Sequence, residues 1–341
     1  MTHGVAVVGY GYWGPNLVRN FARRSDCAVR WVCDLDPARQ AVAAREWPGV
    51  RTAAELGPAL EDPAVELVAI ATPIPHHFPL AQAALQADKH VLVEKPLAGS
   101  VAEAAALVEL ARARRRLLLV DHTYLFTPEV RYVRDMIRRG DLGELYYLDS
   151  VRINLGLFQR DHDVVWDLAP HDLSIFSCWL GRAPRSVLGV GSSHTPSGLA
   201  DVALLHLDYG EQLSASVHVN WLSPVKVRRT LVAGRRRMVH YGELQPGERV
   251  QVYDCGIELP PSDLEGQRRV LVDYRKGDML APFIPAREAL AIEAEEVVAC
   301  LEGRAEPTSP GELGLEVVRV LEALSRSMAM GGVRVGLEEP C

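Results

Sequence analysis

The sequence predicts an α/β protein in two domains: a doubly wound parallel sheet in residues 1–122, then an α+β domain in residues 123–341 whose large, mostly antiparallel sheet has an open face. Two observations support this prediction. Short apolar runs alternate with helical patterns in the first third of the chain, and closely spaced runs that alternate apolar and polar residues follow. In addition, a chain of 341 residues is longer than a single hydrophobic core usually supports, which favours two domains.

The apolar runs of the first third are expected to form strands buried on both faces. They read GVAVVGYG, AVRWVCDLD, VELVAIATP, KHVLVEKP and LLLVDHTY. Helical patterns follow the first four runs, at residues 14–25, 37–47, 76–87 and 101–116. Apolar strands that are each followed by a helix are typical of a parallel sheet covered on both sides.

The pattern changes after about residue 123. A helix is expected at residues 128–140, a strand at 144–155 and a helix over the stretch VVWDLAPHDLSIF (164–176). Alternating runs follow, with turn pairs such as Tyr209–Gly210 and Ala233–Gly234, and two helical segments close the chain at residues 286–303 and 311–328. Closely spaced alternating strands indicate an antiparallel or mixed sheet.

Composition and charge exclude several classes of protein. A formal net charge of -7 argues against a nucleic-acid-binding protein. The six cysteines are scattered without zinc-binding spacing, and the histidines lack ligand spacing, so no metal site is expected. Neither a signal peptide nor a membrane span is recognised, and we expect a cytoplasmic protein without a membrane partner.

The stretch GYGYWG places Gly9, Gly11 and Gly14 in the spacing G-x-G-x-x-G, between the first expected strand and helix. Asp34 follows at the end of the second strand, as the dinucleotide fingerprint requires. The glycines would let a pyrophosphate approach the helix N-terminus. Asp34 would accept hydrogen bonds from the adenosine ribose and repel a 2′-phosphate, which favours NAD(H) over NADP(H). Arg39 could weaken that preference, although we favour its interpretation as a solvated helix residue.

The stretch VVWDLAPHDLSIF carries Asp167, His171 and Asp172 within an apolar helical run. Asp167 and His171 are four positions apart and share one helix face, so both can point into one cleft. Their alternatives are structural: a core histidine, and a helix N-cap at Asp167 with Pro170 in the first turn. Asp172 points about 100° away from His171, and we expect it to cap or pair elsewhere.

The motifs GYGYWGPN, CDLDPAR, ATPIPHH, VLVEKPLA and WDLAPHDLSI occur in this order. Together they resemble the glucose–fructose oxidoreductase / inositol dehydrogenase (Gfo/Idh/MocA) family, over nearly the full length. The most specific part is Glu94-Lys95-Pro96 combined with an Asp-x-x-x-His pair. The resemblance implies a Rossmann domain, a lysine (Lys95) that reaches the nicotinamide ribose and the reacting hydroxyl, and a histidine (His171) that takes the hydroxyl proton. A histidine with an ordinary pKa of about 6.5 suits that transfer.

The resemblance also implies a set of site residues. Catalytic roles are expected for Lys95, His171 and Asp167. Cofactor contacts are expected from Gly9, Gly11, Tyr12, Trp13, Gly14, Asp34, Thr72, Pro73, His77, Glu94 and Lys95. Substrate contacts are expected from Tyr124, Arg152, Asn154, Asp167 and His171. Ile74, Val164–Trp166 and Ala169 depart from the family pattern, which leaves the substrate and the local helix start open.

The runs GYGYWGPNLVRNF, VRINLGLFQ and NWLSPVKVRRTL look like those of nucleotide-sugar dehydrogenases. The resemblance therefore implies NAD-dependent hydride transfer at a secondary alcohol of a nucleotide-linked sugar, such as C3 of a UDP-N-acetylhexosamine. The alternatives are an NAD(P)H-dependent 3-ketoreductase of an NDP-deoxysugar, an inositol or cyclitol dehydrogenase, and a non-catalytic nucleotide-sensing protein.

Basic side chains near the expected cleft, Arg152, Lys226, Arg228 and Arg229, could bind a diphosphate, and solvated strand charges are an equally good interpretation. The open sheet face predicts a homodimer or homotetramer. The function depends on one spatial expectation, that Lys95 and the His171 imidazole converge on one nicotinamide carbon.

Overall fold

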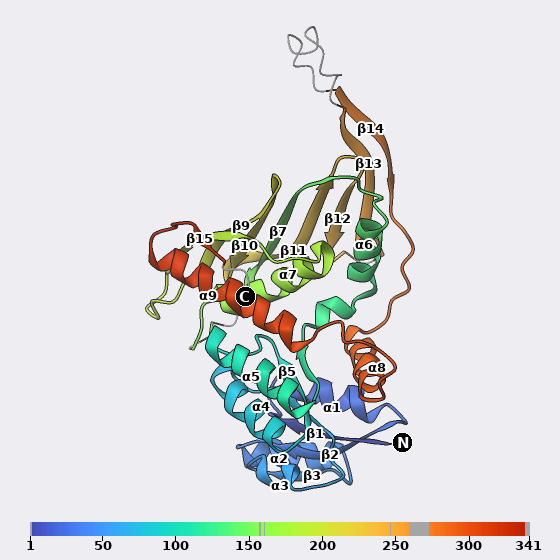
Figure 1. Cartoon of the computed structure of the whole chain (residues 1–341), viewed down its shortest axis with the longest axis vertical. Helices are drawn as coiled ribbons and strands as arrows, with labels where there is room; N and C mark the ends of the chain where they lie inside the picture. The colour runs from blue at the N-terminus through green and yellow to red at the C-terminus, as the bar shows by residue number, and fades with distance from the viewer. Residues whose placement is uncertain (1, 157, 160, 246, 259–272, 338–341) are drawn as a thin grey trace. The chain divides into compact units, whose positions relative to one another are not determined.

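The computed structural model describes residues 2–156, 158–159, 161–245, 247–258 and 273–337. It divides into two compact units (Figure 1). Unit 1 comprises Met1–Thr127 and Arg287–Glu322, and unit 2 comprises Pro128–Ala286 and Ala323–Cys341. Each unit is built around its own sheet, as two-domain proteins of this length require.

Unit 1 contains a six-stranded sheet in the order β3-β2-β1-β4-β5-β6, and every neighbouring pair is parallel. This confirms the doubly wound α/β prediction. The strands are β1 (His3–Val8), β2 (Cys27–Cys33), β3 (Arg51–Ala53), β4 (Leu67–Ile70), β5 (His90–Glu94) and β6 (Leu118–Asp121). The helices among them are α1 (Gly14–Ala22), α2 (Pro37–Glu46), α3 (Gly57–Leu60), α4 (His77–Gln86) and α5 (Val101–Arg114), with short 3-10 helices η1 (Ile74–His76) and η2 (Thr123–Phe126).

The sequence explains why these elements form. The β4 run Leu67–Ile70 is fully buried, as a strand covered on both faces must be. Ser100 caps α5, because its hydroxyl accepts a hydrogen bond from the Glu103 backbone N–H at 3.2 Å. Asp36 caps α2 in the same way, and Pro37 occupies the first helical position.

The division of the chain differs from the predicted one at its C-terminal side. The predicted second domain ran from residue 123 to 341, but residues 287–322 belong to unit 1. The reason is hydrophobic: α8 (Ala289–Leu301) places Leu290, Ala294, Val297 and Val298 in the same buried core as strands β1 and β2. Helix α9 (Gly311–Ala329) contains the third division between the units, after Glu322.

Unit 2 contains a nine-stranded sheet in the order β14-β13-β12-β11-β7-β10-β9-β8-β15. All pairs are antiparallel except β7 with β10, so the sheet is mixed and mostly antiparallel, as predicted. The strands are β7 (Leu145–Leu155), β8 (Ser186–Ser192), β9 (Val202–Gly210), β10 (Leu213–Asn220), β11 (Leu222–Gly234), β12 (Met238–Gly242), β13 (Val250–Glu258), β14 (Asp273–Leu280) and β15 (Val335–Gly336).

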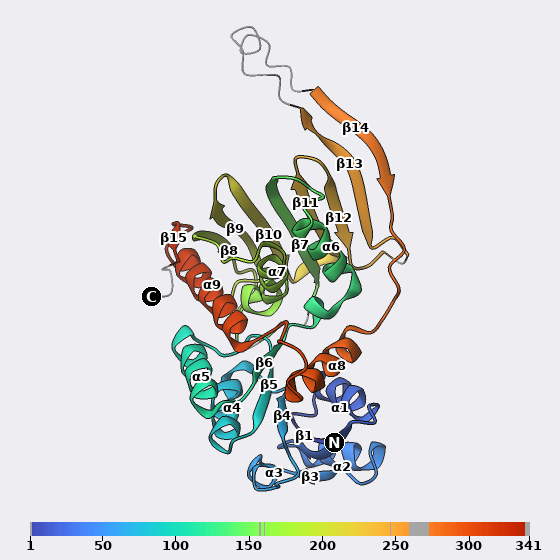
Figure 2. The same cartoon turned by 45° about the vertical axis from the view of Figure 1, so that its right-hand side comes forward.

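Helices cover one face of this sheet. Figures 1 and 2 both show α6 (Pro128–Arg138) and α7 (Val164–Leu180) on the same side of the strands. Along β7, Leu148, Ser150 and Arg152 are buried on the helix side, whereas Tyr147 on the opposite side is 41% exposed. The predicted open face is therefore present within this unit.

Two details of the prediction changed. The turn expected at Tyr209–Gly210 lies at Glu211 and Gln212, whose φ angles of 51° and 65° suit a two-residue hairpin. The short elements β3 and α3, and the strands β13 and β14, had no predicted counterpart. In the part of the chain that the structure describes, no helix combines the length and apolar character that crossing a membrane needs.

Candidate active site

The glycine turn follows β1 at the carboxyl edge of the unit 1 sheet, where ligands bind in such sheets. Gly9 has a φ of +90°, and a Cβ there would lie 2.4 Å from the Ala71 carbonyl oxygen. A Cβ on Gly14 would lie 1.9 Å from the Gly9 carbonyl oxygen. Gly11 differs, because the nearest atom to its would-be Cβ is the flexible Arg39 guanidinium at 3.4 Å. The protein itself requires Gly9 and Gly14, whereas Gly11 leaves space above the backbone.

Asp34 follows β2 beside this turn and is 8% exposed. Its Oδ2 accepts a hydrogen bond from the Tyr10 backbone N–H at 2.6 Å, and its Oδ1 accepts one from the Asp36 N–H at 2.9 Å. The Arg39 guanidinium lies 3.6 Å from Oδ2 and 3.7 Å from the Asp36 carboxylate. Asp34 therefore holds the turn and keeps lone pairs for further donors. Arg39 is half exposed and paired with both acids.

His77 fixes the two loops that carry Thr72, Pro73, Lys95 and Pro96. Its Nδ1 lies 2.8 Å from the Pro96 carbonyl oxygen and its Nε2 lies 2.7 Å from the Thr72 carbonyl oxygen. The ring is 1% exposed, and burial lowers its pKa. Its backbone N–H donates to the Ile74 carbonyl oxygen at the end of η1, whereas its ring lies against the two loops. The buried ring therefore links the loop after β4 to the loop after β5, which carries Lys95. The Thr72 hydroxyl has no partner among the described residues.

Two of the three aromatic residues of the turn, Tyr12 and Trp13, occupy different environments. Tyr12 is 89% exposed, and its ring stacks on Trp13 with centroids 6.4 Å apart. Trp13 is the N-cap residue of α1, and its Nε1 donates to Asp121 Oδ2 at 2.6 Å.

Glu94 Oε2 accepts the Lys95 backbone N–H at 3.0 Å. Tyr124 lies in η2, where its carbonyl oxygen accepts the Thr127 hydroxyl.

The helix α7 of unit 2 carries Asp167 and His171. Asp163 is its N-cap and accepts hydrogen bonds from the Val165 and Trp166 N–H groups at 3.0 and 3.1 Å. The alternative of Asp167 as the N-cap is therefore wrong, and Pro170 lies inside the helix. Asp167 and His171 are both half-buried, in contrast to Leu168, Ala169 and Asp172, which are buried.

Sequence reasoning missed Trp221, which orients Asp167. The Trp221 indole is 1% exposed, and its Nε1 donates to Asp167 Oδ2 at 3.0 Å. The Phe158 ring meets the indole edge-on at 5.5 Å. Gly156 lies against both Trp221 and the Asn154 amide, so the predicted substrate residues Asn154 and Asp167 occur around one tryptophan. The sequence signal was a tryptophan closing an alternating strand, within NWL.

Arg152 is not placed to meet a substrate. Its side chain is 2% exposed; Nε donates to Asp172 Oδ2 at 2.9 Å and Nη2 donates to Glu243 Oε1 at 2.6 Å. Ser150 also donates to Asp172, at 2.8 Å. The expected pairing of Asp172 elsewhere than with His171 is thereby confirmed. Because Arg152 is engaged by two buried carboxylates, we assign it to the core that holds α7 on β7 rather than to the substrate site.

Two of the other basic candidates of this region also have acidic partners. Arg228 lies 3.4 Å from Glu243, and Arg229 lies 3.3 Å from Asp149. Lys226 is exposed on β11. Within the described ranges, no group of three His, Cys, Asp or Glu side chains could hold a metal ion.

The chain matches two family models in succession. Residues 3–122 match the model described as an oxidoreductase family with an NAD-binding Rossmann fold, and residues 130–240 match the Gfo/Idh/MocA C-terminal domain. The chain belongs to the Gfo/Idh/MocA family. It is accordingly an oxidoreductase whose first unit is an NAD-binding Rossmann domain.

Several known proteins are similar to this chain over most of its length. An uncharacterized oxidoreductase of Escherichia coli, YdgJ, is 30% identical over 86% of this chain and 90% of its own. A UDP-N-acetylglucosamine 3-dehydrogenase of Acidithiobacillus ferrooxidans is 29% identical over 82% and 85%. The crystal structure of GenD2 from gentamicin A biosynthesis, in complex with NAD, superposes with a TM-score of 0.82 at 24% identity, over 99% and 97% of the two chains. That likeness shows the shared fold.

Proposed function

We propose that this oxidoreductase transfers hydride between NAD and a secondary alcohol of a sugar, in particular a nucleotide-linked hexose oxidised at C3. The observation that carries the proposal is α7, an otherwise apolar helix that presents Asp167 and His171 one turn apart, with Asp167 held by Trp221. The same chain supplies Lys95 at the carboxyl edge of an NAD-binding sheet. A base, a cation and a dinucleotide site are the parts that alcohol oxidation needs.

In this proposal the residues of the site divide the oxidation among them. Bound NAD would supply the hydride acceptor for the alcohol carbon. His171 takes the hydroxyl proton, so that the alcohol becomes a carbonyl as one hydride and one proton leave. The Lys95 ammonium stabilises negative charge that develops on the oxygen. Asp167, whose Oδ2 accepts the Trp221 N–H, orients the imidazole or binds a sugar hydroxyl.

Two lines of support favour a nucleotide-linked sugar. The first is the sequence similarity to a UDP-N-acetylglucosamine 3-dehydrogenase over more than four fifths of both chains. The second is Phe158, whose ring is 43% exposed and packs on the buried Trp221 indole, because an exposed aromatic ring suits the apolar face of a sugar. Lys226 is the exposed cation that we propose for the diphosphate.

We also propose NAD(H) in preference to NADP(H). The Asp34 carboxylate lies at the end of β2, where the ribose hydroxyls of a bound dinucleotide are recognised. Its negative charge would repel a 2′-phosphate. The Arg39 guanidinium, which could attract that phosphate, is already paired with Asp34 and Asp36.

A substrate panel tests the function directly. The purified protein is mixed with NAD⁺ or NADP⁺ and with UDP-N-acetylhexosamines, dTDP-sugars, inositols and free hexoses, and reduced nicotinamide is followed by its absorbance. We expect the highest kcat/KM with NAD⁺ and a UDP-N-acetylhexosamine. Turnover of inositol alone would establish a cyclitol dehydrogenase instead. Nucleotide binding without turnover in either direction would establish a sensor.

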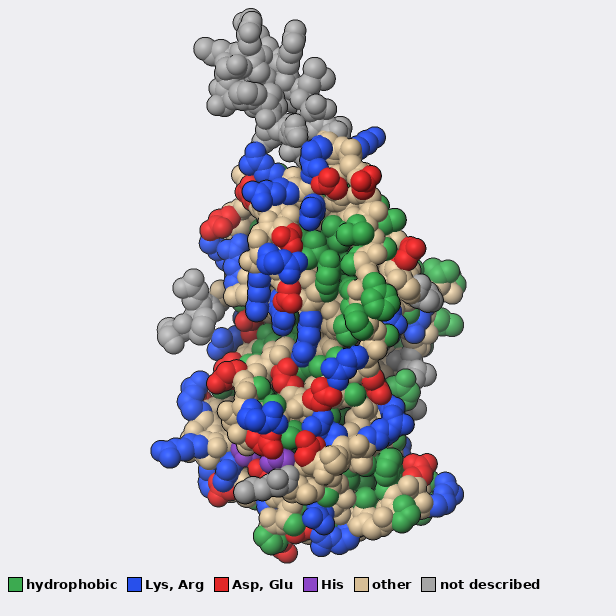
Figure 3. Space-filling view, turned by 90° about the vertical axis from the view of Figure 1, so that its right-hand side faces the viewer, with side chains coloured by type: hydrophobic (Ala, Val, Ile, Leu, Met, Phe, Trp, Pro, Cys, Tyr) green, Lys and Arg blue, Asp and Glu red, His purple; other side chains and the backbone are tan. Residues whose placement is uncertain are grey.

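We further propose that the outer face of the unit 2 sheet binds a second copy of this chain. Val190, Leu204, His218 and Val151 form one row of register partners on it, and Leu204 is 58% exposed. Figure 3 shows hydrophobic side chains gathered on one side of this unit, beside a strip rich in arginine and lysine. Exposed apolar surface of this kind marks an interface.

Substitution Leu204→Glu is expected to convert the oligomer to monomers, because it would bury a charge against apolar side chains of the partner copy. Light scattering during size-exclusion chromatography measures the mass. The matched control is Leu244→Glu, at an exposed leucine outside the row, which should leave the mass unchanged. A wild-type protein that is monomeric at micromolar concentration would refute the proposed interface.

A further inference from the structure

Three carboxyl groups meet behind the NAD-binding turn of unit 1. Glu94 and Asp121 are register partners at the ends of β5 and β6, and Glu293 comes from α8. Asp121 is 1% exposed and Glu293 is 2% exposed. Three carboxylates cannot all be ionised when buried together, because each negative charge disfavours the next. Some of these groups must therefore carry protons.

Asp121 is the member that accepts hydrogen bonds. Its Oδ2 accepts from the Trp13 indole Nε1–H at 2.6 Å, and its Oδ1 accepts from the Thr123 hydroxyl at 2.6 Å. Such short distances are typical of bonds to an ionised carboxylate. A carboxylate has about four acceptor positions in total, so Asp121 has room for two more donors.

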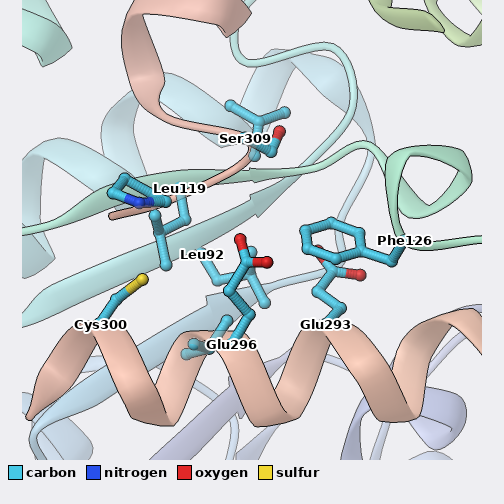
Figure 4. Close-up of a pocket in the computed structure, with 10 residues that line it drawn as sticks. Leu92, Leu119, Phe126, Glu293, Glu296, Cys300 and Ser309 are labelled. Atoms are coloured by element: carbon cyan, nitrogen blue, oxygen red, sulfur yellow. The ribbon is translucent and has the colours of Figure 1, made fainter. Parts of the chain in front are cut away.

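Glu293 is the member that lacks donors. Neither of its oxygens receives a hydrogen bond from any residue that the structure describes. Figure 4 shows Glu293 pointing from α8 toward Phe126, next to a small pocket whose lining also includes Leu92 and Leu119. Burial first, and then the charge and hydrogen bonding of Asp121, raise the pKa of Glu293 well above its usual value. As a neutral acid, Glu293 has one O–H, which it could donate to Asp121.

The other charged and titratable groups near this pair agree with a neutral Glu293. Burial, then the Asp121 charge, also raises the pKa of Glu94, although the nearby Lys95 opposes this rise. His122 is buried with its Nδ1 2.9 Å from the Ser309 hydroxyl, and burial lowers its pKa to about 3, so it stays neutral. Glu296, from the next turn of α8, adds negative charge near Glu293. The negative charge of Glu296 disfavours a further negative charge on Glu293, and the neutral His122 offers no positive charge that would stabilise one.

We propose that Glu293 is a positioning residue for NAD binding: its carboxylic acid donates to Asp121, Asp121 holds the Trp13 indole, and Trp13 fixes the start of α1. Trp13 is the N-cap residue of that helix, and its carbonyl oxygen accepts the Asn16 N–H at 2.9 Å. The indole thus ties the first turn of α1, whose N–H groups would face the pyrophosphate of a bound dinucleotide, to the end of β6. The proposal rests on the proposed use of this turn for NAD.

Two variants at one position separate donation from packing. Glu293→Gln keeps the shape and still donates to Asp121 through its amide, whereas Glu293→Met fills similar space and donates nothing. Glu295→Gln is the matched control, because Glu295 is on the same helix but exposed, and pairs with Arg287 at 2.7 Å. NADH dissociation constants are measured for the four proteins from neutral to alkaline pH. Circular dichroism establishes that each is folded.

We expect Glu293→Met to weaken NADH binding about tenfold, the equivalent of roughly 1.4 kcal/mol, and Glu293→Gln to bind like the wild type at neutral pH. As the pH rises and Glu293 ionises, only proteins with Glu293 should lose affinity, and the Gln variant should not. Equal NADH affinity of the Gln and Met variants would overturn the proposal. A flat wild-type curve beside a weakened Met variant would still support donation by a proton that Glu293 never loses.

A readout without nucleotide keeps this result separate from the proposed function. In protein labelled with ¹⁵N-tryptophan, the Trp13 indole N–H resonance reports its short bond to Asp121. We expect this resonance to stay in place in Glu293→Gln and to shift in Glu293→Met, whether or not the protein turns over any sugar. An unmoved resonance in both variants would show that Glu293 does not act on Trp13.

Discussion

Substitution of His171 by asparagine is expected to lower kcat about 10²- to 10⁴-fold, the usual contribution of a general base. NADH affinity should remain close to that of the wild type, because the imidazole acts on the substrate hydroxyl and not on the dinucleotide. Steady-state rates and NADH titration measure the two effects. With a substrate deuterated at the reacting carbon, the isotope effect on kcat should also increase if the chemical step becomes rate-limiting.

A matched control for this experiment is His194→Asn. The His194 side chain follows β8, is 55% exposed and pairs with Asp201 at 2.7 Å, and its substitution should leave kcat unchanged. Lys95→Met is expected to be similarly harmful, and the double variant should lose much less than the product of the two single losses, as residues acting on one step do. Fully multiplicative losses, or an active His171→Asn enzyme, would show that these two side chains do not share the hydroxyl.

The fold was predictable because its signals are local. Continuous apolar runs such as Leu67–Ile70 and the alternation in β9 and β10 each identify a strand from a few neighbouring residues. The return of α8 to unit 1 was not predictable in this way. Its apolar residues mark a buried face, but only the three-dimensional core shows that Val297 and Val298 pack with Val5 and Val7 of β1.

Those parts of the candidate site were predictable whose residue type and local spacing indicate a chemical role. The glycine turn, Asp34 and the Asp167–His171 spacing could be read from the chain. Their partners could not, because Trp221 is 54 positions from Asp167 and Asp121 is 108 positions from Trp13. Arg152 shows a limit of the opposite kind: an arginine near an expected cleft suggests a phosphate ligand, whereas its burial between Asp172 and Glu243 favours a structural role.

The buried network of Arg152 yields the largest expected change in stability. Asp172→Ala should lower the free energy of unfolding by about 3–5 kcal/mol, because it leaves the guanidinium buried with half of its partners gone. The Asp172 carboxylate is fully buried and accepts from Arg152 and Ser150. Denaturant unfolding followed by circular dichroism measures the loss. If the Ala variant does not fold, Asp172→Asn keeps one acceptor and should show a smaller loss in the same direction.

Strand β7, which carries Arg152, also carries an exposed ion pair that serves as a control for the effect of burial. Asp149 pairs with Arg229 at 3.3 Å on the outer face of β7, where the two side chains are 34% and 40% exposed. Asp149→Ala should therefore cost less than about 1 kcal/mol. Most of the loss in unfolding free energy at Asp172→Ala comes from leaving the Arg152 guanidinium buried without its partner. The double variant Arg152→Met/Asp172→Leu should therefore lose less than the sum of the losses of the two single variants. If Arg152→Met instead raises KM many-fold and leaves the unfolding midpoint unchanged, Arg152 binds substrate after all, and the network would have to open in the working enzyme.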